Sequence, residues 1–440
     1  MAVVLGKLGA KAVALTLGAL FVFVTACGSS SSTPTQSATD VTVWTAWGGN
    51  ELKAFQDVLK PFTAQTGIKV HISTVRDSSQ LAINVDAGTT LPDIGLPPNV
   101  DKVQDWVSKG VMKPIETALG DQFQDYMTNT VSSLTTDQGG KSTNTQIYLV
   151  NGKHYGLFVK TQVKGLLWYD PKVYTGQAPA TWNDLIAIDP AKYNAKSLFC
   201  TGIESGAASG WPAVDDFDNI LMRQAGHDTY NNLIAGKVKF SDPQIKQAYQ
   251  SLGQMFSASY GGKNTILTTN FGKAGDPMFK SPAGCLFLEQ ATFITSFFEQ
   301  DNPGVKASTD YNFFPHPSMG NPAGDGNVNG FADSLVMYND TPAARKLMQY
   351  VASKDAQQIW VNDGGTLAAN KQVTYNDPIS KAAFAVVQGA KNLEVTAGDF
   401  VPSDMQSAFW KSMLDYVNNP GGLDGILSHL DSVQKSAYSS

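Results

Sequence analysis

Tryptophan and carboxylate side chains next to loops of small residues are the groups in this chain that could do chemistry. Trp47 lies in the loop after an alternating segment, residues 41–44, and Glu51 follows that loop. Glu204 and Trp211 flank a run of Ser, Gly and Ala. An indole can stack on the apolar CH face of a pyranose ring, and a carboxylate accepts hydrogen bonds from its hydroxyls. Flat rings beside such acceptors are typical of a sugar-binding site.

Each of these residues also has a purely structural explanation. Trp47 could pack between helices, and Glu51 could be a first-turn carboxylate favoured by the helix dipole. We assign Trp47 to a site because ligands of α/β proteins gather at the carboxyl ends of strands. Trp211 is assigned to stacking because packing alone hardly explains a large ring that follows a loop of small residues.

The elements that must position these residues begin with a strand–helix–strand unit. Residues 41–44 alternate as a strand, apolar residues recur at helical spacing over 52–62, and residues 68–72 form a second strand. This order predicts an α/β lobe with a largely parallel sheet. Thr181 and Thr341 have the pattern of helix N-caps, the latter followed by Pro.

Length and composition limit the classes of function. About 400 residues beyond the N-terminal segment are more than one core supports, so we expect two lobes. The net charge of −6 and the absence of a basic tract make nucleic acid a poor partner. The five histidines are scattered along the sequence. We therefore expect no metal site, and we expect no cofactor because the sequence holds no nucleotide-binding fingerprint.

The N-terminus has the pattern of a bacterial lipoprotein signal. Lys7 and Lys11 precede an apolar run, residues 12–26, and small residues lead to Cys27. The run is about 15 residues, whereas a transmembrane helix needs about 20. We interpret residues 1–26 as a signal peptide, Cys27 as the lipidated residue and 27–39 as a disordered tether. The protein is then expected on the outer or periplasmic face of the cell membrane, held there by lipid.

The two other cysteines, Cys200 and Cys285, form one pair in an oxidising compartment. A disulfide between them is the expected outcome. It would close a loop of about 85 residues and contribute on the order of 4 kcal/mol in the chain-entropy model.

Several segments together resemble the extracellular solute-binding proteins of ABC importers. The resemblance is to family 1, the carbohydrate-binding group that includes maltose-binding proteins. The segments that carry it are 43–48 with 62–70, then 91–94, 153–157 with 167–170, and 407–410. Residues 204–212 and 276–279 look closer to the α-glucoside binders of that group.

The resemblance implies an α/β, bilobal, periplasmic-binding-protein-like fold of type II. Its two lobes are joined by hinge crossovers, with a ligand cleft between them. Lobe 1 would comprise residues 40–158 and 330–363, and lobe 2 would comprise 159–329 and 364–440.

The resemblance also adds residues to the expected site. Trp410 matches an aromatic residue that stacks on sugar, and Asn99, Glu289 and Asp333 stand where polar cleft residues occur. Asn99 could instead be a turn residue, and Lys160, at the predicted crossover, is expected to be solvated. The expected ligand-binding residues are Trp47, Glu51, Asn99, Glu204, Trp211, Glu289, Asp333 and Trp410.

The function that the resemblance implies is capture of a sugar and its delivery to an ABC permease. The sugar would be an α-glucoside or another mono- or oligosaccharide, and the protein is expected to be a monomer and not an enzyme. An extracellular glycosidase remains an alternative, because Asp215, Asp216 and Asp218 offer carboxylates. We interpret those three as a helix N-terminal turn. A second alternative keeps the fold and replaces the sugar with a non-sugar ligand, such as a polyamine, a peptide or a metal chelate.

Overall fold

The computed structural model describes residues 39–75, 79–97, 100–131, 148–364 and 366–439. The predicted signal peptide, Cys27 and most of the predicted tether lie outside these residues, as does Asn99. Within the described part of the chain, no helix combines the length and the apolar character needed to span a membrane.

The first sheet begins with the predicted strand–helix–strand unit, which is confirmed. Strand β1 (Asp40–Thr45) pairs in parallel with β2 (Lys69–Thr74) and with β3 (Ile94–Gly95). Between β1 and β2 runs helix α1 (Gly49–Thr66), whose apolar positions, Phe55 among them, are buried. The helix ends at Gly67, where φ is +70° and the amide donates to the Thr63 carbonyl.

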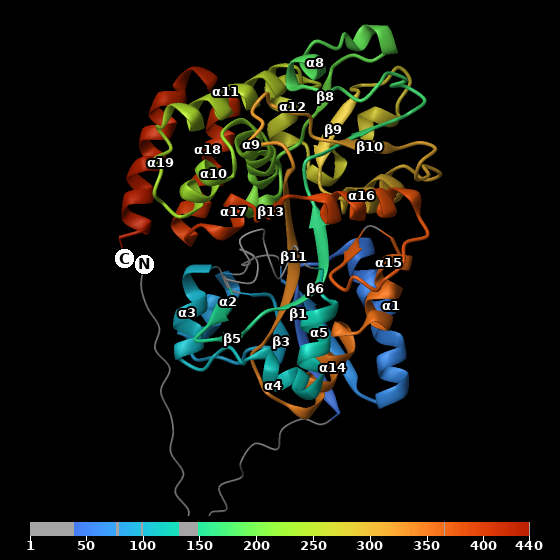
Figure 1. Ribbon diagram of the computed structural model, residues 1–440, viewed down its shortest axis with the longest axis vertical. Helices are drawn as coiled ribbons and strands as arrows, with labels where there is room; N and C mark the ends of the chain where they lie inside the picture. The colour runs from blue at the N-terminus through green and yellow to red at the C-terminus, as the bar shows by residue number, and fades with distance from the viewer. Residues whose placement is uncertain (1–38, 76–78, 98–99, 132–147, 365, 440) are drawn as a thin grey trace, which may run out of the picture. The chain divides into compact units, whose positions relative to one another are not determined.

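Two longer strands complete this sheet and lead out of it. Strand β6 (Leu157–Val163) pairs antiparallel with β11 (Asn327–Met337) and with β12 (Leu367–Ala368), and the order is β12-β6-β11-β3-β1-β2. Because β11 also pairs antiparallel with β3, the sheet is mixed, and the expectation of a largely parallel sheet was wrong. Strand β13 (Asn392–Glu394) pairs with the start of β11. Figure 1 shows β6 and β11 side by side, passing from one group of helices to the other. The predicted lobe boundaries at 158/159 and 329/330 fall inside these strands, and the division into lobes stays a prediction.

The second sheet follows directly from β6. Its strands are β7 (Leu166–Tyr169), β8 (Phe199–Cys200), β9 (Phe287–Gln290) and β10 (Asn312–Pro315), in the order β10-β7-β9-β8. Only Lys164 and Gly165 separate β6 from β7. Cys200 and Cys285 are bonded to each other at the β8 end of this sheet, with Cα atoms 5.4 Å apart, as the sequence led us to expect. A small hairpin pairs β4 (Leu149–Val150) with β5 (Lys153–His154).

Helices cover both sheets. Besides α1, the helices formed by residues between or next to the strands of the first sheet are α2 (Ser79–Asp86), α3 (Val100–Ser108), α4 (Ile115–Leu119), α5 (Phe123–Asn129), α14 (Pro342–Ala352) and α15 (Lys354–Asn362). The expected cap at Thr341 is confirmed, because its side chain accepts from the Ala344 amide. The core here joins α1, α14 and the strands, with Trp360 among its largest side chains.

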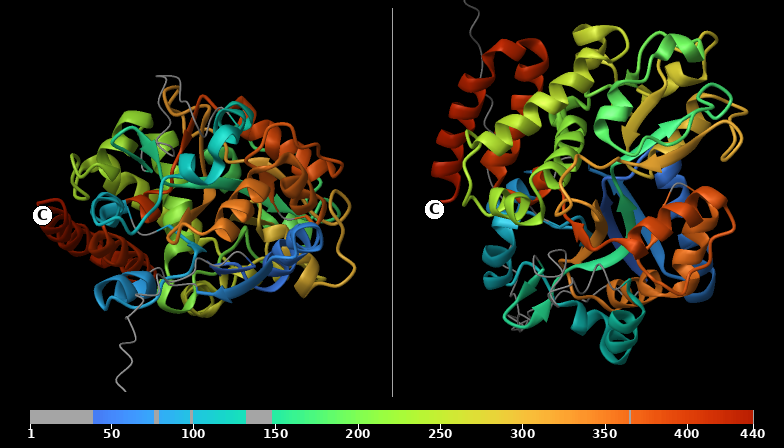
Figure 2. Two further views of the ribbon diagram at one scale, coloured as in Figure 1. Left: turned by 90° about the horizontal axis from the view of Figure 1, so that it is seen from below. Right: turned by 45° about the horizontal axis from the view of Figure 1, so that its top comes forward.

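The second group of helices includes α9, whose residues 212–223 are all buried and which contacts α10, α11, α17 and α18. Its α-helices are α8 (Trp182–Ile186), α9 (Trp211–Gln224), α10 (His227–Ile234), α11 (Pro243–Ser257), α12 (Gly262–Thr268), α13 (Ile294–Asp301), α16 (Pro378–Gly389), α17 (Ala397–Phe400), α18 (Ser403–Asn418) and α19 (Leu423–Ala437). Thr181 and Asp184 form the predicted capping box. The views in Figure 2 keep α18 and α19, in red, side by side.

Candidate functional site

Strand β6 and the residue that follows it carry three buried polar side chains. Lys160 and Gln162 alternate along the strand and so point the same way, Lys164 comes directly after its last residue, and each of the three is at most 3% exposed. Residues that follow the carboxyl ends of β1 and β9 contact these side chains. Glu51 of α1, after β1, pairs with Lys160, and Thr292, after β9, donates to Gln162 at 2.9 Å. Residues that follow strands of both sheets therefore contact side chains of β6.

Lys160 forms the first of two buried ion-pair clusters. Its Nζ lies 2.8 Å from Glu51 Oε1 and 3.0 Å from Asp333 Oδ2, and its side chain is 2% exposed, against 24% and 20% for the carboxylates. Burial alone would lower the pKa of Lys160, but the two carboxylates raise it above its usual value. The ammonium therefore stays charged and holds both carboxylates in place. The expectation of a solvated Lys160 was wrong, because all residues of β6 are buried and Glu51 and Asp333 pair with its ammonium there.

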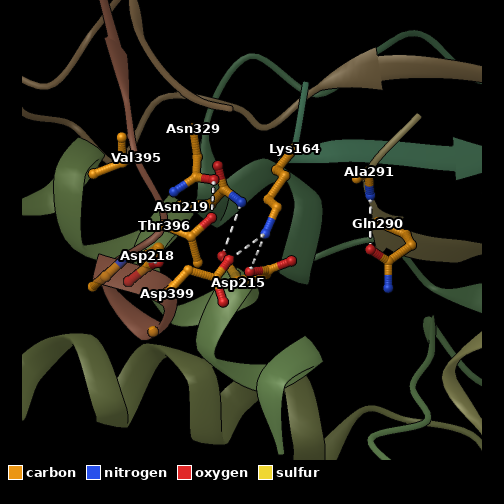
Figure 3. Close-up of polar contacts among 12 residues, drawn as sticks. Lys164, Asp215, Asp218, Asn219, Gln290, Ala291, Asn329, Val395, Thr396 and Asp399 are labelled. Carbon is orange, nitrogen blue, oxygen red and sulfur yellow. Dashed lines mark hydrogen bonds and ion pairs between the residues drawn. The ribbon is translucent and has the colours of Figure 1, made fainter. Parts of the chain in front are cut away.

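Lys164 forms the second cluster, which Figure 3 shows. Its Nζ lies 2.7 Å from Asp215 Oδ1 of α9 and 3.9 Å from Asp399 Oδ2 of α17. Burial raises the pKa of Asp215 to about 7, although Lys164 opposes that rise. Loss of hydration, opposed by Lys164, and then the charge of Asp333 raise the pKa of Asp399. The side chain of Asp399 is 40% exposed, so its carboxylate can be reached from solvent.

An aromatic patch adjoins Lys164. The Trp211 ring lies 5.7 Å from Lys164 Nζ, edge-on to Phe271 at 5.0 Å and tilted against Phe293 at 6.0 Å. Trp211 is the first residue of α9, and Phe293 follows β9. Trp211 and Phe293 are only partly buried, so the patch can offer a ring surface to a ligand.

The expected residues that the structure brings together are Glu51, Asp333 and Trp211, through Lys160 of β6 and Lys164, which follows it. Sequence reasoning missed Lys164 and Asp399 as members of the same cluster. The available signal was the spacing of two lysines four residues apart in an otherwise uncharged, strand-like segment, because alternation along an extended segment puts both on one face.

Trp47 is placed differently from our expectation. It is 4% exposed and lies edge-on to Phe55 at 5.0 Å and to Trp360 at 4.8 Å, with Lys160 Nζ 4.9 Å from its ring. Its rings belong to the core of the first sheet. This burial corrects the expectation of a free stacking face, and the packing explanation is the one that fits.

Glu289 also lies inside a core. Its side chain is 1% exposed on β9, and His316 Nε2 is 3.8 Å from its carboxylate. Neither carboxylate oxygen has a hydrogen-bond partner among the described residues. Burial raises the pKa of Glu289 to about 8, against the effect of Arg223. The expectation that Glu289 faces a cleft is corrected, because β9 turns this side chain toward α9.

Asp215, Asp216 and Asp218 are a related correction. They do not form a solvated first turn: α9 begins at Trp211, and the three are 5%, 5% and 0% exposed. Asp218 accepts from the Ala397 amide at 2.8 Å, which ties α9 to α17. These three carboxylates therefore lie in the protein interior and have a structural role.

The remaining expected residues lie beside the aromatic patch. The Glu204 carboxylate accepts from Asn270 Nδ2 at 2.8 Å and from the Gly206 amide at 2.7 Å, and the Asn270 bond is the main cause of its lowered pKa. Trp410, on α18, is partly buried against the core of the second sheet. Gly210, whose φ is +105°, lies against the Trp410 backbone so closely that a side chain there would clash with it. Across the described ranges, no three His, Cys, Asp or Glu side chains are arranged to hold a metal ion.

A known protein family and several known sequences match most of this chain. A family model described as bacterial extracellular solute-binding protein matches residues 57–386. The osmoprotective compounds-binding protein of Synechocystis sp. is 27% identical over 422 residues, which cover 93% of this chain and 95% of that protein. The α-glucosides-binding periplasmic protein of Rhizobium meliloti is 26% identical over 420 residues, with 90% and 87% covered.

Solved structures agree on the fold. A bacterial solute receptor described as having a preference for β-D-galactopyranose superimposes with a TM-score of 0.76 at 16% identity, covering 91% of this chain and all of that one. A chitin oligosaccharide binding protein gives a TM-score of 0.75 at 18% identity, with 92% and 100% covered. The prediction of an α/β, bilobal fold of type II is therefore confirmed.

Proposed function

The chain belongs to the bacterial extracellular solute-binding protein family, and from this premise we propose that it is the sugar-binding receptor of an ABC importer. It captures an uncharged sugar between its two lobes and passes it, unchanged, to a membrane permease. The residues proposed to meet the sugar are Trp211, Glu51, Asp333 and Asp399, with Phe293 beside Trp211.

The observation that carries this proposal is the aromatic patch beside partly exposed carboxylates. Trp211 and Phe293 offer ring surface, and Glu51, Asp333 and Asp399 offer oxygens next to Lys160 and Lys164. A pyranose needs both: a flat apolar contact for its CH face and acceptors for hydroxyls that leave water. Hydrogen bonds to charged acceptors are the stronger kind, and the buried lysines hold these carboxylates in place through ion pairs.

The two sets of groups also suit a receptor whose lobes close on a ligand. Glu51 comes from the first sheet's helix α1, whereas Trp211 and Asp399 come from helices around the second sheet. A sugar that contacts both sets binds the closed arrangement more tightly than the open one and so shifts the population toward it. We place Glu204 and Trp410 at the border of this site and propose lobes of 40–158 with 330–363 and of 159–329 with 364–440.

The names of two related proteins suggest which solute to test first. One relative is called a binder of α-glucosides and another a binder of osmoprotective compounds. We propose an α-glucoside as the first solute to test. We also propose that Cys27 carries the lipid that anchors the protein to the outer face of the cell membrane, and that the protein works as a monomer.

A polyamine is the second candidate solute, because the charges at the site favour it. Four carboxylates, Glu51, Asp333, Asp215 and Asp399, face two lysines.

The decisive experiment is calorimetry on a Cys27→Ser form without its signal peptide, with α-glucosides, galactosides and spermidine as titrants. Binding of a sugar alone supports the proposal; binding of spermidine and no sugar replaces it.

A further inference from the structure

The Asp399 carboxylate, which the proposed function assigns to the sugar, is carried by a helix of a single turn. This helix, α17, comprises four residues, Ala397–Phe400. A helix this short is not stable through its own hydrogen bonds, because fixing the first turn costs more free energy than its bonds return. The position of Asp399 therefore depends on the contacts that other elements make with this segment.

Side chains of two other helices cap the start of α17. The Ala397 amide donates to Asp218 Oδ2 of α9 at 2.8 Å and to the Tyr230 hydroxyl oxygen of α10 at 2.9 Å. The hydroxyl of the N-cap residue, Thr396, is engaged elsewhere, because it donates to Asn329 Oδ1 at 3.3 Å. Figure 3 shows Asp218, Asn329 and Thr396 around this segment. Since the first amides of a helix lack partners within it, Asp218 and Tyr230 take the role that a local cap residue usually has.

The Tyr230 hydroxyl is the central group of this arrangement. It donates to the Val395 carbonyl at 2.5 Å, and it accepts from Asn329 Nδ2 of β11 at 3.3 Å as well as from the Ala397 amide. Tyr230, Val395 and Asn329 are all fully buried. Loss of this hydroxyl would leave buried polar groups without a partner, and such a loss costs more than that of an exposed hydrogen bond.

Helix α18 holds α17 from another side. Gln406 Nε2 of α18 donates to the Gly398 carbonyl at 2.7 Å. A side chain on Gly398 would meet Val214 of α9, since its Cβ would lie only 2.9 Å from a methyl group there. Asp399 is the next residue, with Lys164 Nζ 3.9 Å from its carboxylate. The backbone before Asp399 is thus held by neighbouring helices, while the carboxylate itself stays accessible.

We propose that Tyr230 is a positioning residue for sugar binding. Its hydroxyl, together with Asp218, fixes the backbone around Ala397, so that the Asp399 carboxylate is in place before a sugar hydroxyl reaches it. A group placed in advance needs no ordering when the ligand binds, whereas a loosely held α17 would have to be ordered at a cost in affinity. This inference rests on the proposed sugar-binding function and adds to it a residue that acts through another side chain.

The test removes the hydroxyl and keeps the ring. Tyr230→Phe is preferred to a change at Asp218, because the charge of Asp218 also acts on Lys164. Tyr249→Phe is the matched control: Tyr249 is fully buried in the same core, and its hydroxyl is hydrogen-bonded to that of Ser412 at 2.9 Å. Both variants lose one buried hydroxyl and should lose stability. Tyr230→Phe loses bonds to the segment that leads into α17, whereas Tyr249→Phe loses a bond to α18.

Each tyrosine variant is made in the parent protein and in an Asp399→Asn background. After circular dichroism has shown that the proteins fold, they are titrated by calorimetry with maltose, trehalose and melibiose. Tyr230→Phe should weaken the tightest of these sugars about 3- to 10-fold in the parent. It should change affinity less than about twofold in the Asp399→Asn background, and Tyr249→Phe should do the same in both backgrounds. This dependence on Asp399 is a result that a merely structural role of Tyr230 would not produce.

Equal weakening by Tyr230→Phe in both backgrounds overturns the inference, and so does unchanged affinity in the parent. An Asp399→Asn protein that binds sugar as tightly as the parent overturns it as well. If Tyr230→Phe does not fold, Gln406→Met replaces it in the same cycle, with the same expected and contrary results, because it removes the donor to the Gly398 carbonyl. A parent protein that binds none of the three sugars contradicts the proposed function itself, and the inference with it.

Discussion

Lys164 and Asp215 form an ion pair of 2.7 Å in which the two side chains are only 4% and 6% exposed. Breaking a buried pair leaves one charge without a partner, which costs far more than the loss of a surface pair. Lys164 also reaches Asp399 and lies over Trp211, so this pair joins the crossover strand to both α9 and α17.

Lys164→Met should therefore lower the free energy of unfolding by on the order of 3 kcal/mol at pH 8. The loss should be smaller at pH 6, because Asp215, whose pKa is about 7 even beside Lys164, takes up a proton. Urea denaturation at the two pH values measures both effects. Lys53→Met is the control: its side chain is 69% exposed, and the loss of its surface pair with Asp57 should change stability little. A Lys164→Met protein as stable as the parent at pH 8 contradicts the buried-pair account.

The buried carboxyls of the second sheet should make stability fall as pH rises. Burial raises the pKa of Asp215 to about 7 and that of Glu289 to about 8, whereas unfolded carboxyls titrate near 4. Between these values the folded state binds more protons than the unfolded state, so the free energy of unfolding decreases from about pH 4 to pH 8.

Glu289→Gln should flatten that decline, because the amide keeps the shape and cannot ionise. We expect the variant to gain stability relative to the parent at pH 8 and to gain less at pH 5, measured by urea denaturation at both. Asp57→Asn serves as the control, since the pKa of Asp57 is lowered by its bonds to Lys53 and Lys60 and so it stays ionised throughout this range. An equal slope for Glu289→Gln and the parent would show that Glu289 does not carry the proton.

Local sequence patterns predicted the elements well where the pattern and the packing agree. The alternation of residues 41–44, the helical spacing up to Phe62 and the caps at Thr181 and Thr341 all appear in the structure. These signals depend on neighbours within a few residues, so one chain is enough to read them.

Predictions for single site residues failed where a distant segment decides exposure. Trp47 follows a strand end as expected, but Trp360, more than 300 residues later, covers its ring. Lys160 is buried because Glu51 and Asp333 come from two other elements to meet it. A sequence can show that these residues share a strand face, but it cannot show which partners the fold brings to that face.

Trp211 and Asp333 should each matter for the affinity of the sugar. Trp211→Ala removes ring surface and Asp333→Asn removes a charged acceptor, so each should weaken binding about 10- to 100-fold, from about 1.5–3 kcal/mol per lost contact. Trp47→Phe is the control, because that ring is buried and its replacement should leave affinity unchanged while lowering stability. Calorimetry with the best α-glucoside measures all three. Unchanged affinity in both site variants would show that the sugar binds at a different place on the protein.

Cys27→Ser should release the protein from the membrane. We expect Lys7, Lys11 and the apolar run before Cys27 to direct processing, and a cysteine thiol is the group that can take a thioether-linked lipid. Two or more acyl chains make a stable anchor, whereas the Ser-rich segment after Cys27 has no apolar surface with which to bind a bilayer. In a bacterium that processes lipoproteins, the parent should partition into the detergent phase and incorporate labelled palmitate, and Cys27→Ser should do neither. Ser29→Ala, two residues away, should behave as the parent does, and a Cys27→Ser protein that still sediments with membranes would rule out the thiol as the point of attachment.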